Sequence, residues 1–357
     1  MRIIYTLLTL LLFVNLVMPQ SGNSIQGVVK DKQTGIPLAN VNVYLAYTLI
    51  GTTTDGEGNY HIKSIPSGSY NLIVSHIQYT KETEPVSFLK RESNFYLDFA
   101  LSPKIFQLPE VIVEDDSDDW WQLFDQFREE LLGFTENADS CEILNPTAVN
   151  FSRTGWYDTE AVCTEPLYII NTALGYKITY DLEYFFMDGI ATKFTGTPFF
   201  EELEPYSTEE EDNWFYNREN TYYGSLRDFL HNICERQKNN SWESDPIPFD
   251  MGFKYPGLGN AISIASFSDH MTATDSSDFN LHFSNKLSVW FDKYQEDEPF
   301  HYSCGMELTK DTVSIDYYGR TYDKFGIKTT GYWSKQRLGD MLPMEYFPPE
   351  EFEKTIE

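Results

Sequence analysis

The feature of this chain that most constrains its fold is a series of short apolar segments between Ile25 and Leu101. In one of them, Val41, Val43 and Leu45 place every second side chain on the same face. The other segments are similar, and their apolar residues are Ile25, Val28, Val29, Tyr60, Ile62, Tyr70, Leu72, Val74, Phe95, Leu97, Phe99 and Leu101. A period of two residues is typical of β-strands with one buried face. The stretch therefore predicts several short strands.

Turn-forming residues separate these segments at 34–37, 55–59 and 66–68. Each turn contains glycine, which adopts positive φ angles, and two of them contain proline, which restricts φ. The chain can therefore reverse its direction at each position. Short strands at this spacing predict a small antiparallel β-sandwich.

Three motifs occur in order along the same stretch. They are G-V-V-x-D-x-x-T-G-x-P-L-x-x-V-x-V from Gly27, G-T-T-T-D-x-x-G-x-Y from Gly51 and I-P-x-G-x-Y-x-L from Ile65. Residues 24–103 thereby resemble the carboxypeptidase regulatory-like domain, which implies a transthyretin-like or Ig-like β-sandwich. The resemblance also implies an accessory module without peptidase activity. Such modules occur at the N-terminus of many Gram-negative envelope proteins, including TonB-dependent receptors.

Residues 1–21 have the pattern of a secretory signal peptide. Arg2 supplies the positive charge, and the apolar run from Ile3 to Val17 is long enough for a signal but short for a membrane span. No Cys lies near the expected cleavage region, which argues against a lipoprotein anchor. No later run predicts a transmembrane segment in the mature chain. We therefore expect export to the periplasm, the outer membrane or the cell surface.

The chain is strongly acidic, with 55 acidic and 26 basic residues and a formal net charge of −29. This charge argues against nucleic acid or anionic lipid as a partner. The acidic excess favours a solvated surface over a site for cations. The expected partner is a protein or glycan of the cell envelope, and the sequence leaves the oligomeric state open.

Four cysteines occur, namely Cys141, Cys163, Cys234 and Cys304. An exported chain with an even number of cysteines can form two disulfides, in any of three pairings. No C-x-x-C spacing supports a zinc ribbon or a thioredoxin-type site. Cys234 lies on the apolar face of a predicted helix, so a buried thiol is the competing interpretation for this residue.

Residues 104–119 form an acidic linker in this interpretation. Within it, residues 108–113 resemble the segment that follows the regulatory-like module in TonB-dependent receptors, near the part that engages TonB. A plain linker, or an extra strand at a sheet edge, is the alternative that we favour because the apolar run is short. The remaining chain is too short for the 22-stranded barrel of such a receptor.

Residues 120–350 are predicted to form a second, β-rich α+β domain with two or so helices, so the fold class is mainly β. After a possible N-cap at Ser117 and Asp118, the first helix carries apolar residues at helical spacing, and Gly133 ends it. These apolar residues are Trp120, Phe124, Phe127 and Leu131. A second helix spans 225–237, with Ser225 and Asp228 as a capping box.

The remaining elements of this domain are predicted strands and loops. Alternation places Tyr176, Ile178, Tyr180, Leu182, Tyr184 and Phe186 on one face of a strand. Further strands are predicted at 191–200, 281–291 and 312–318, and residues 187–189 predict a hairpin. Residues 201–213 are predicted to be an exposed acidic loop.

The second domain also resembles envelope proteins known only as carboxypeptidase-like regulatory domain-containing proteins. The resemblance rests on the segments 127–146, 166–185, 214–233 and 331–346. In those relatives the helix often reads S-L-R-H-F, whereas this chain has Asp228 at the His position. The resemblance implies no activity and no catalytic residues.

The sequence contains no recognisable catalytic motif. None of the histidines, His61, His76, His231, His270, His282 and His301, has Glu three residues later, so the HxxE pair of zinc carboxypeptidases is absent. The HExxH, G-x-S-x-G, Walker and dinucleotide-binding motifs are also absent. We therefore predict no catalytic, cofactor-binding or metal-binding residues and no cofactor.

Three weaker patterns have structural explanations that we favour. Residues 87–90 match S-x-x-K but lie between predicted strands and lack partner motifs. Asp55, Glu57 and Asn59 have the spacing of calcium ligands, yet Asp, Gly and Asn are the usual residues of a turn. Trp214, Arg218 and Arg227 lie around the second helix, where a salt bridge that holds helix to sheet outweighs a ligand site.

These observations favour a non-catalytic exported protein that binds or scaffolds through its two domains. One alternative is a peptide or glycan hydrolase whose carboxylate pair in the second domain has no sequence signature. Another is an accessory subunit that docks an outer-membrane machine through a sheet edge near Val111.

Overall fold

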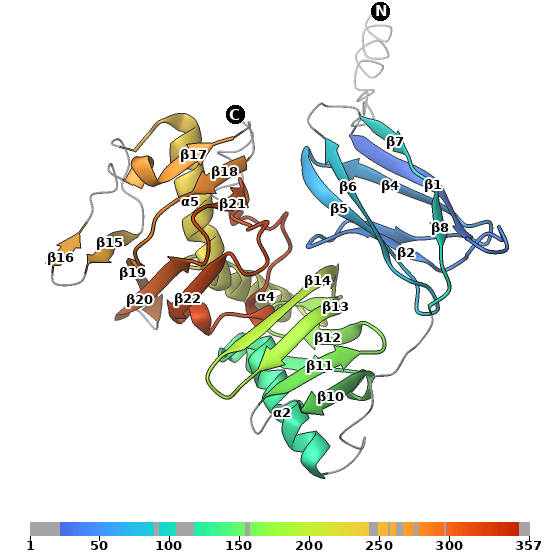
Figure 1. The fold of residues 1–357 in the computed structure, drawn as a ribbon, viewed down its shortest axis with the longest axis horizontal. Coiled ribbons are helices and arrows are strands. Elements are labelled where there is room, and N and C mark those ends of the chain that lie inside the picture. Colours follow the sequence, from blue (N-terminus) through green and yellow to red (C-terminus); the bar gives the residue numbers. More distant parts are fainter. Residues whose placement is uncertain are drawn as a thin grey trace, which may run out of the picture. The chain divides into compact units, whose positions relative to one another are not determined.

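The computed structural model describes residues 22–88, 93–104, 118–153, 158–242, 249–255, 258–261, 267–274, 278–295 and 298–349. The chain divides into two units. Unit 1 consists of Met1–Ala46 and Ile50–Ile105, and unit 2 consists of Tyr47–Leu49 and Phe106–Glu357. Figure 1 labels the helices and strands of both.

Unit 1 is a β-sandwich of two sheets. The first sheet has the order β4-β1-β7, with β8 also paired to β1, and the second has the order β3-β2-β5-β6. The strands are β1 Asn23–Asp31, β2 Asn42–Leu45, β3 Gly51–Thr53, β4 Asn59–Ile65, β5 Gly68–Ser75, β6 Glu82–Phe88, β7 Asn94–Tyr96 and β8 Phe99–Leu101. The predicted fold class, mainly β with an N-terminal sandwich, is confirmed.

Alternating burial along the strands builds the core of the sandwich. In β1 the residues Ile25, Val29 and Asp31 are buried, whereas Gln26 and Lys30 are exposed. A side chain of the size of Ile or Val contributes about 2 kcal/mol when it is removed from water. The alternation of apolar residues in the sequence therefore predicts the buried face of this strand correctly.

The prediction of a purely antiparallel sandwich is wrong in one respect. The strands β7 and β8 run parallel to β1, because the chain crosses over after β6 before it returns beside β1. They are also two strands rather than one, since Asp98 leaves the ladder and its carboxylate accepts a hydrogen bond from the Val28 backbone at 2.8 Å. Gly27 permits this approach, because a Cβ there would lie 1.8 Å from the carbonyl oxygen of Leu97.

Unit 2 contains two hydrophobic cores. The first is built by a six-stranded sheet of order β10-β11-β13-β12-β9, with β14 paired to β13, and by helix α2 (Figure 1). Its elements are α2 Asp118–Leu132, α3 Glu136–Asp139, β9 Cys141–Ile143, the 3-10 turn η2 Pro146–Ala148, β10 Val149–Arg153, β11 Thr159–Cys163, β12 Leu167–Asn171, β13 Tyr176–Met187 and β14 Thr192–Glu202.

Helix α2 follows the predicted pattern. Its buried side chains lie on one face and belong to the same core as the sheet, and they are Trp120, Leu123, Phe124, Phe127, Leu131 and Leu132. The helix ends at Leu132, because Gly133 adopts a φ of +111° that other residues rarely adopt. The predicted N-cap at Ser117 lies outside the described residues.

A β-bulge changes the phase of β13. Its pairing with β14 shifts register between Leu182 and Tyr184, so that Glu183 and Tyr184 are both exposed and Phe185 is buried. The prediction that Tyr184 shares the buried face of Tyr180 is therefore wrong. A bulge adds one residue to a strand, and every side chain beyond it points to the opposite face.

Two adjacent helices follow the sheet, α4 Thr208–Tyr222 and α5 Leu226–Asn239. The predicted exposed loop at 201–213 is wrong at both ends, because Glu201 and Glu202 belong to β14 and the chain is helical from Thr208 onward. Ser207 caps α4 by accepting a hydrogen bond from the Glu210 backbone at 3.2 Å, and three glutamates in the first turn complement the helix dipole. Helix α5 was predicted, and Ser225 accepts from the Asp228 backbone as expected.

The second core of unit 2 lies around α5. It is formed with a five-stranded sheet of order β16-β15-β19-β20-β22 and a three-stranded sheet of order β17-β18-β21. The elements are β15 Asp250–Tyr255, β16 Leu258–Ala261, η3 Ser268–His270, β17 Met271–Ala273, β18 Asp278–Leu281, β19 Leu287–Gln295, β20 Glu298–Leu308, β21 Val313–Asp316, β22 Ile327–Gly331, η4 Tyr332–Ser334 and η5 Leu338–Asp340.

Two predicted strands of this core need correction. The segment 281–291 is not one strand, because β18 ends at Leu281 in one sheet and β19 begins at Leu287 in the other. The segment 312–318 is shorter than predicted, because β21 ends at Asp316. There the carbonyl of Asp316 accepts a hydrogen bond from the Gly319 backbone at 3.0 Å and starts a turn.

The last described residues return to the first core, and we call residues 337–347 the closing segment. Leu338 and Leu342 are buried in that core, and Asn171 of β12 donates its side-chain amide to the Gly339 carbonyl at 2.8 Å. Arg337 forms an ion pair with Glu130 of α2 at 2.5 Å. The first core is thus completed by residues that come after the second core in the sequence.

All four cysteines are free thiols, so the two disulfides that their even number allows are not formed. Cys141 donates to the Asn137 carbonyl at 3.3 Å, and Cys234 donates to the Asp316 carbonyl at 3.6 Å. The interpretation of Cys234 as a buried thiol is confirmed. Within the described ranges, every helix is either too short or too polar to cross a membrane.

Candidate functional site

The residues with calcium-like spacing form a turn in unit 1. One carboxylate oxygen of Asp55 accepts hydrogen bonds from the backbones of Glu57 at 3.0 Å and Asn59 at 2.8 Å. Hydrogen bonds from Asn59 lower the pKa of Asp55 below its usual value. The carboxylate is thus occupied by the turn that joins β3 of one sheet to β4 of the other, and the interpretation as a turn is confirmed.

Two other sequence candidates fall partly or wholly outside the described residues. Ser87 lies in β6, where its hydroxyl is 3.0 Å from that of Ser69, but Lys90 is outside the described ranges. The linker residues 108–113, with the sheet edge predicted near Val111, also lie outside the described residues.

Trp214 and Arg218 fasten α4 to the turn between β12 and β13. The indole of Trp214 donates to the Thr172 carbonyl at 2.8 Å. The guanidinium of Arg218 donates to the Leu174 carbonyl at 2.7 Å and forms an ion pair with Glu202 at 3.0 Å. The predicted structural role is confirmed for Arg218, although both residues lie on α4 rather than on α5.

Arg227 also has a structural role, and backbone carbonyls are among its partners. Its two terminal nitrogens donate to the carbonyl oxygens of Pro343, Met344 and Tyr346 at 2.7–2.8 Å. The guanidinium has five N–H donors in a fixed fork, and several carbonyls of one segment satisfy them as well as a carboxylate does. Arg227 therefore holds the closing segment against α5.

Of the six histidines, His270 and His282 lie together, with ring centroids 6.4 Å apart. His231 is buried on α5, and burial lowers its pKa to about 3, with Arg227 and Lys238 lowering it further. His301 pairs with Asp292 at 2.6 Å on the surface. Across the ranges that the structure describes, no group of three or more His, Cys, Asp or Glu side chains could hold a metal ion.

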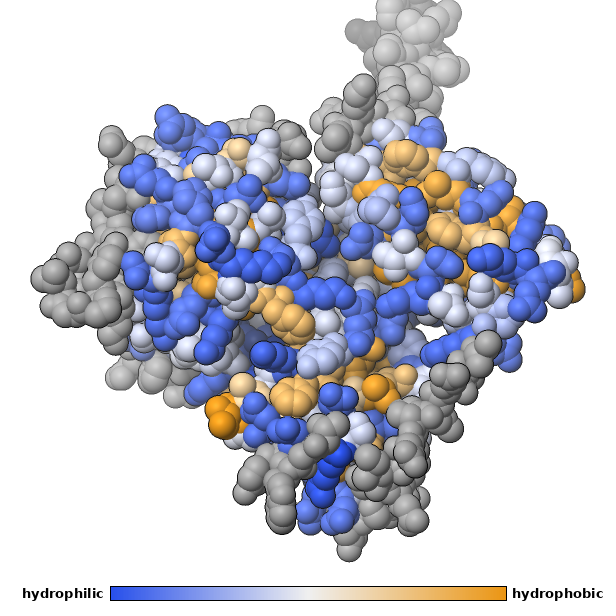
Figure 2. Space-filling model, in the orientation of Figure 1, coloured by the Kyte–Doolittle hydropathy of each residue, from blue (hydrophilic) through white to orange (hydrophobic). Residues whose placement is uncertain are grey.

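Three exposed aromatic rings of unit 2 lie on β13 and on the loop between β21 and β22, and we call Tyr184, Tyr322 and Phe325 the aromatic surface. Their side chains are 41%, 44% and 43% exposed, respectively. The rings of Tyr184 and Phe325 meet edge to face, with centroids 6.0 Å apart. Figure 2 shows orange, hydrophobic side chains among the hydrophilic ones on this unit.

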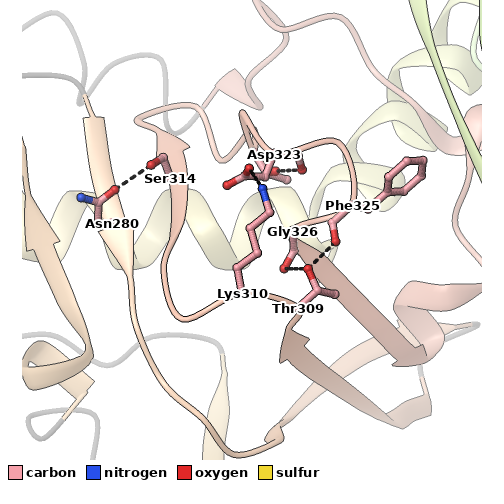
Figure 3. Close-up of polar contacts among 8 residues, drawn as sticks. Asn280, Thr309, Lys310, Ser314, Asp323, Phe325 and Gly326 are labelled. Atoms are coloured by element: carbon pink, nitrogen blue, oxygen red, sulfur yellow. Dashed lines mark hydrogen bonds and ion pairs between the residues drawn. The ribbon is translucent and has the colours of Figure 1, made fainter.

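The bulge in β13 exposes Tyr184, and a well-anchored loop presents the other two rings. Residues 317–326 connect β21 to β22. Thr309 donates its hydroxyl to the Phe325 carbonyl at 2.6 Å, and Tyr322 donates its hydroxyl to Asp278 at 2.9 Å. Figure 3 shows the Lys310 ammonium directed at Asp323 beside the contact of Thr309 with the Phe325 carbonyl. The rings are therefore held in place rather than carried on a loose loop.

The charges beside the aromatic surface are paired with one another. Lys324 forms an ion pair with Glu183 of the bulge, and Lys310 forms one with Asp323. Arg320 pairs with Asp316 at 2.9 Å. The surface thus offers polar hydrogen-bonding groups around apolar rings, and the Asp278 carboxylate beside Tyr322 adds one acid to these three pairs.

A separate cavity of about 550 Å³ lies between α2 and the hairpin that joins β13 to β14. Helix α2 contributes Leu123, Gln126, Glu129 and Glu130. The hairpin contributes Met187 and residues 189–192, and the remaining lining residues are Arg153, Thr159 and Arg337. The volume is within the range of small-molecule sites.

The cavity has two acidic and two basic side chains, but one of each is already paired. Glu130 and Arg337 form an ion pair, and the Arg337 guanidinium also donates to the Glu130 carbonyl. Among the described residues, neither Glu129 nor Arg153 has an ion-pair partner. The lining therefore provides no pair of unpaired carboxylates of the kind that a glycosidase uses.

Sequence reasoning missed both features. A signal for the aromatic surface exists, since Tyr322 and Phe325 lie in a polar loop bounded by Gly319 and Gly326. The exposure of Tyr184 depends on the bulge, which no pattern indicated. The cavity joins residues that are far apart in the chain, so spacing carries no signal for it.

Comparison with known proteins identifies the N-terminal domain. Residues 25–113 match the family model of the CarboxypepD_reg-like domain. The resemblance predicted for this part of the chain is thereby confirmed. The match covers unit 1 and not the β-rich part of unit 2, and no curated protein matches the chain.

Solved structures show only distant similarity. One is a chain of a type II cohesin–X-dockerin complex from Acetivibrio cellulolyticus, with 20% identity and a TM-score of 0.18. This match covers 22% of the present chain and 53%, about half, of the cohesin–X-dockerin chain. A Bacteroides uniformis protein provisionally described as carbohydrate binding has 10% identity and a TM-score of 0.18, covering 82% and 98%. A Bacteroides fragilis protein of unknown function, provisionally described as membrane-associated, has 9% identity and a TM-score of 0.19, covering 87% and 97%. These TM-scores are too low to carry an argument.

Proposed function

We propose that this chain is a non-catalytic binding protein of the cell envelope and that its aromatic surface binds a neutral glycan. The observation that carries the proposal is the fixed, half-exposed arrangement of Tyr184, Tyr322 and Phe325. Exposed apolar rings cost free energy in water unless a ligand covers them. A bulge and an anchored loop hold these rings at the surface instead of letting them turn inward.

The chemistry around the rings favours a glycan. A sugar ring has apolar C–H faces, which pack on aromatic rings, and hydroxyl groups, which need hydrogen-bond donors and acceptors beside them. The Lys324–Glu183 and Lys310–Asp323 pairs supply both kinds of group. Because these charges balance one another, the surface favours a neutral ligand over a charged one.

A binding role agrees better with the described residues than hydrolysis does. Glu130 in the cavity is paired with Arg337, so Glu129 lacks a second unpaired carboxylate beside it. Unit 1 matches the CarboxypepD_reg-like domain, and its resemblance to the carboxypeptidase regulatory-like domain implies an accessory module without peptidase activity. These observations support the proposal of a protein without its own chemistry.

Export is part of the proposal and has its own test. Residues 1–21 carry the pattern of a secretory signal peptide. We expect N-terminal sequencing of the natural protein to begin near residues 20–22 and cell fractionation to place it in the envelope. A cytoplasmic protein that retains Met1 would contradict this part.

Affinity electrophoresis in gels that contain neutral polysaccharides tests the glycan. A panel of soluble glucans, mannans and xylans would be compared with a polymer-free gel. We expect one class to retard the mature chain, and Tyr184→Ala, Tyr322→Ala and Phe325→Ala each to reduce the retardation. Tyr216→Ala is the matched control, because Tyr216 is also exposed but lies on α4.

Three results would overturn parts of this proposal. If no neutral polysaccharide retards the protein but envelope proteins are captured through Tyr184, the ligand is a protein. If retardation survives all three alanine substitutions, the aromatic surface is not the site. If purified protein releases reducing sugar and Glu129→Gln abolishes this release, the chain is a hydrolase.

A further inference from the structure

We infer that the cavity between α2 and the β13–β14 hairpin binds a small zwitterion with an aliphatic body, such as a short peptide with free ends. This inference concerns a different site from the aromatic surface and does not depend on the glycan. The cavity volume of about 550 Å³ suits a ligand of this size.

The charges of the lining indicate a ligand with two opposite charges. Glu130 and Arg337 neutralise each other in an ion pair. The other two charged residues of the lining are Glu129 on α2 and Arg153 at the end of β10. Neither of these two has an ion-pair partner among the residues that the structure describes. A ligand carboxylate can bind the Arg153 guanidinium in a two-point geometry, and a ligand ammonium can bind the Glu129 carboxylate.

A ligand with a single charge fits this lining less well. An anion that covers the cavity would remove Glu129 from water without giving it a partner, and a cation would do the same to Arg153. Glu129 and Arg153 are both exposed in the free protein, and covering a charge without giving it a partner costs free energy. A zwitterion avoids both costs, because it pairs with each side chain.

The apolar part of the lining indicates an aliphatic body. Leu123 and Met187 are buried lining residues that belong to the core, and Ile190 is 94% exposed at the tip of the hairpin. The hairpin turn is fixed, because the Asp188 carboxylate accepts hydrogen bonds from the backbones of Ile190 and Ala191 at 2.8–2.9 Å. An isoleucine held in water at the edge of a cavity gains free energy when an aliphatic ligand covers it.

Isothermal titration calorimetry with the full mature chain tests the inference. The probe is the tripeptide Ala-Leu-Ala with free ends, and its N-acetylated and C-amidated forms each lack one charge. We expect each capped form to bind the natural protein at least about tenfold more weakly, because one ion pair inside the cavity is lost.

Two substitutions assign each end of the ligand. Glu129→Gln should lower the affinity for the free peptide and abolish the difference in affinity between the free and N-acetylated forms. Arg153→Gln should also lower the affinity for the free peptide and abolish the difference between the free and C-amidated forms. Glu142→Gln is the control, because Glu142 is an exposed acid on β9 and does not line the cavity. Thermal unfolding shows whether each variant remains folded.

The results that contradict the inference are distinct. Absence of heat at millimolar peptide would overturn it, as would equal affinity for the free and capped peptides. If the Glu129 and Arg153 variants bind the free peptide as tightly as the natural protein does, the peptide binds elsewhere. Glycan retardation by the aromatic surface is expected to be unchanged in both variants.

Discussion

The Nδ1 atom of His231 lies 2.8 Å from the carbonyl oxygen of Tyr317, and the two rings meet edge to face with centroids 4.9 Å apart. The imidazole is buried on α5 beside the cations Arg227 and Lys238. Burial disfavours its charged form more than either cation does. His231 is therefore neutral in the folded protein at pH values where an exposed histidine is protonated.

This burial predicts acid sensitivity of unit 2. The pKa of His231 is lowered from 6.5 to about 3 on folding, so its contribution to stability is fully present above pH 6.5 and falls as the pH drops toward 3. The expected loss is roughly 1.4 kcal/mol per pH unit within this window. Urea unfolding at pH 7, 5.5 and 4.5 measures it.

His231→Gln is the matched variant, because glutamine can donate to the Tyr317 carbonyl but does not titrate. We expect this variant to be less stable at pH 7 and to lose less stability on acidification than the natural protein. Burial raises the pKa of the nearby Asp316, which acts in the opposite direction, since its protonation in acid favours the folded state. The difference between the two proteins isolates His231, and equal slopes for both would refute the assignment.

The contact between Gly175 and Trp214 predicts a strong steric coupling. A Cβ at Gly175 would lie 2.3 Å from the Trp214 ring, and Gly175 has a φ of +68°. Gly175→Ala should therefore destabilise unit 2 by about 2 kcal/mol or more. Trp214→Leu makes room, so the double variant should cost less than the sum of the two single changes in chemical denaturation. If the losses of unfolding free energy in the two single variants add up in the double variant, the Trp214 ring does not cause the destabilisation by Gly175→Ala.

Arg227 predicts a local effect on the closing segment. A lysine cannot reach several carbonyls with one point charge, so Arg227→Lys should loosen residues 343–346 and cost about 2 kcal/mol. Limited proteolysis followed by mass spectrometry should show earlier cleavage within this segment. Lys335→Arg is the control, since Lys335 is exposed nearby. Unchanged cleavage in Arg227→Lys would mean that the carbonyl contacts add little.

The turn at Asp55 predicts a titration shift in unit 1. Its hydrogen bonds from Asn59 and Glu57 favour the carboxylate, so NMR titration should give a pKa below 3.8. The stability that this group contributes is present above pH 3.8 and lost as the pH falls through the lowered pKa. Asp55→Asn should remove that dependence, and 5 mM or so of calcium should not shift the melting temperature. A calcium-dependent rise in melting temperature would favour a cation site instead.

The cysteines predict selective alkylation. Burial raises the pKa of Cys141 to about 12 and raises that of Cys234 as well, so both thiols should resist iodoacetamide in the folded protein. Cys163 is less buried and should react first. Mass spectrometry without reductant should count one fast modification in native protein and four in urea. A protein with fewer than four reactive thiols in urea would contain a disulfide.

Sequence patterns predicted the turns and helices that are determined by residues close together in the chain. The turn at Asp55, the α2 stripe with its end at Gly133 and the cap at Ser225 all follow from residues within a few positions of one another. Helix α4 had a comparable signal in Ser207 and Glu210, but the acidic composition suggested a loop. Here the capping bond and the dipole outweigh the repulsion between neighbouring glutamates.

Long-range pairing creates most of the two candidate sites, so the sequence signals only the polar loop that carries Tyr322 and Phe325. Strict alternation placed Tyr184 inward, and only the register between β13 and β14 reveals the bulge that turns it outward. The cavity unites Leu123, Arg153 and Arg337, whose proximity depends on the complete fold of unit 2. The spacing of residues in a single sequence does not indicate which distant residues will lie next to one another in the fold.

The closing segment also has a consequence for how the protein is made. A chain leaves the ribosome from its N-terminus, so α2 and the sheet of β9 to β14 emerge long before Leu338 and Leu342, which complete their core. In that interval the groove for the closing segment is open and apolar. We therefore expect the nascent chain to need chaperone protection until its last residues arrive, and chains that stop before Leu338 to aggregate rather than accumulate as a smaller folded protein.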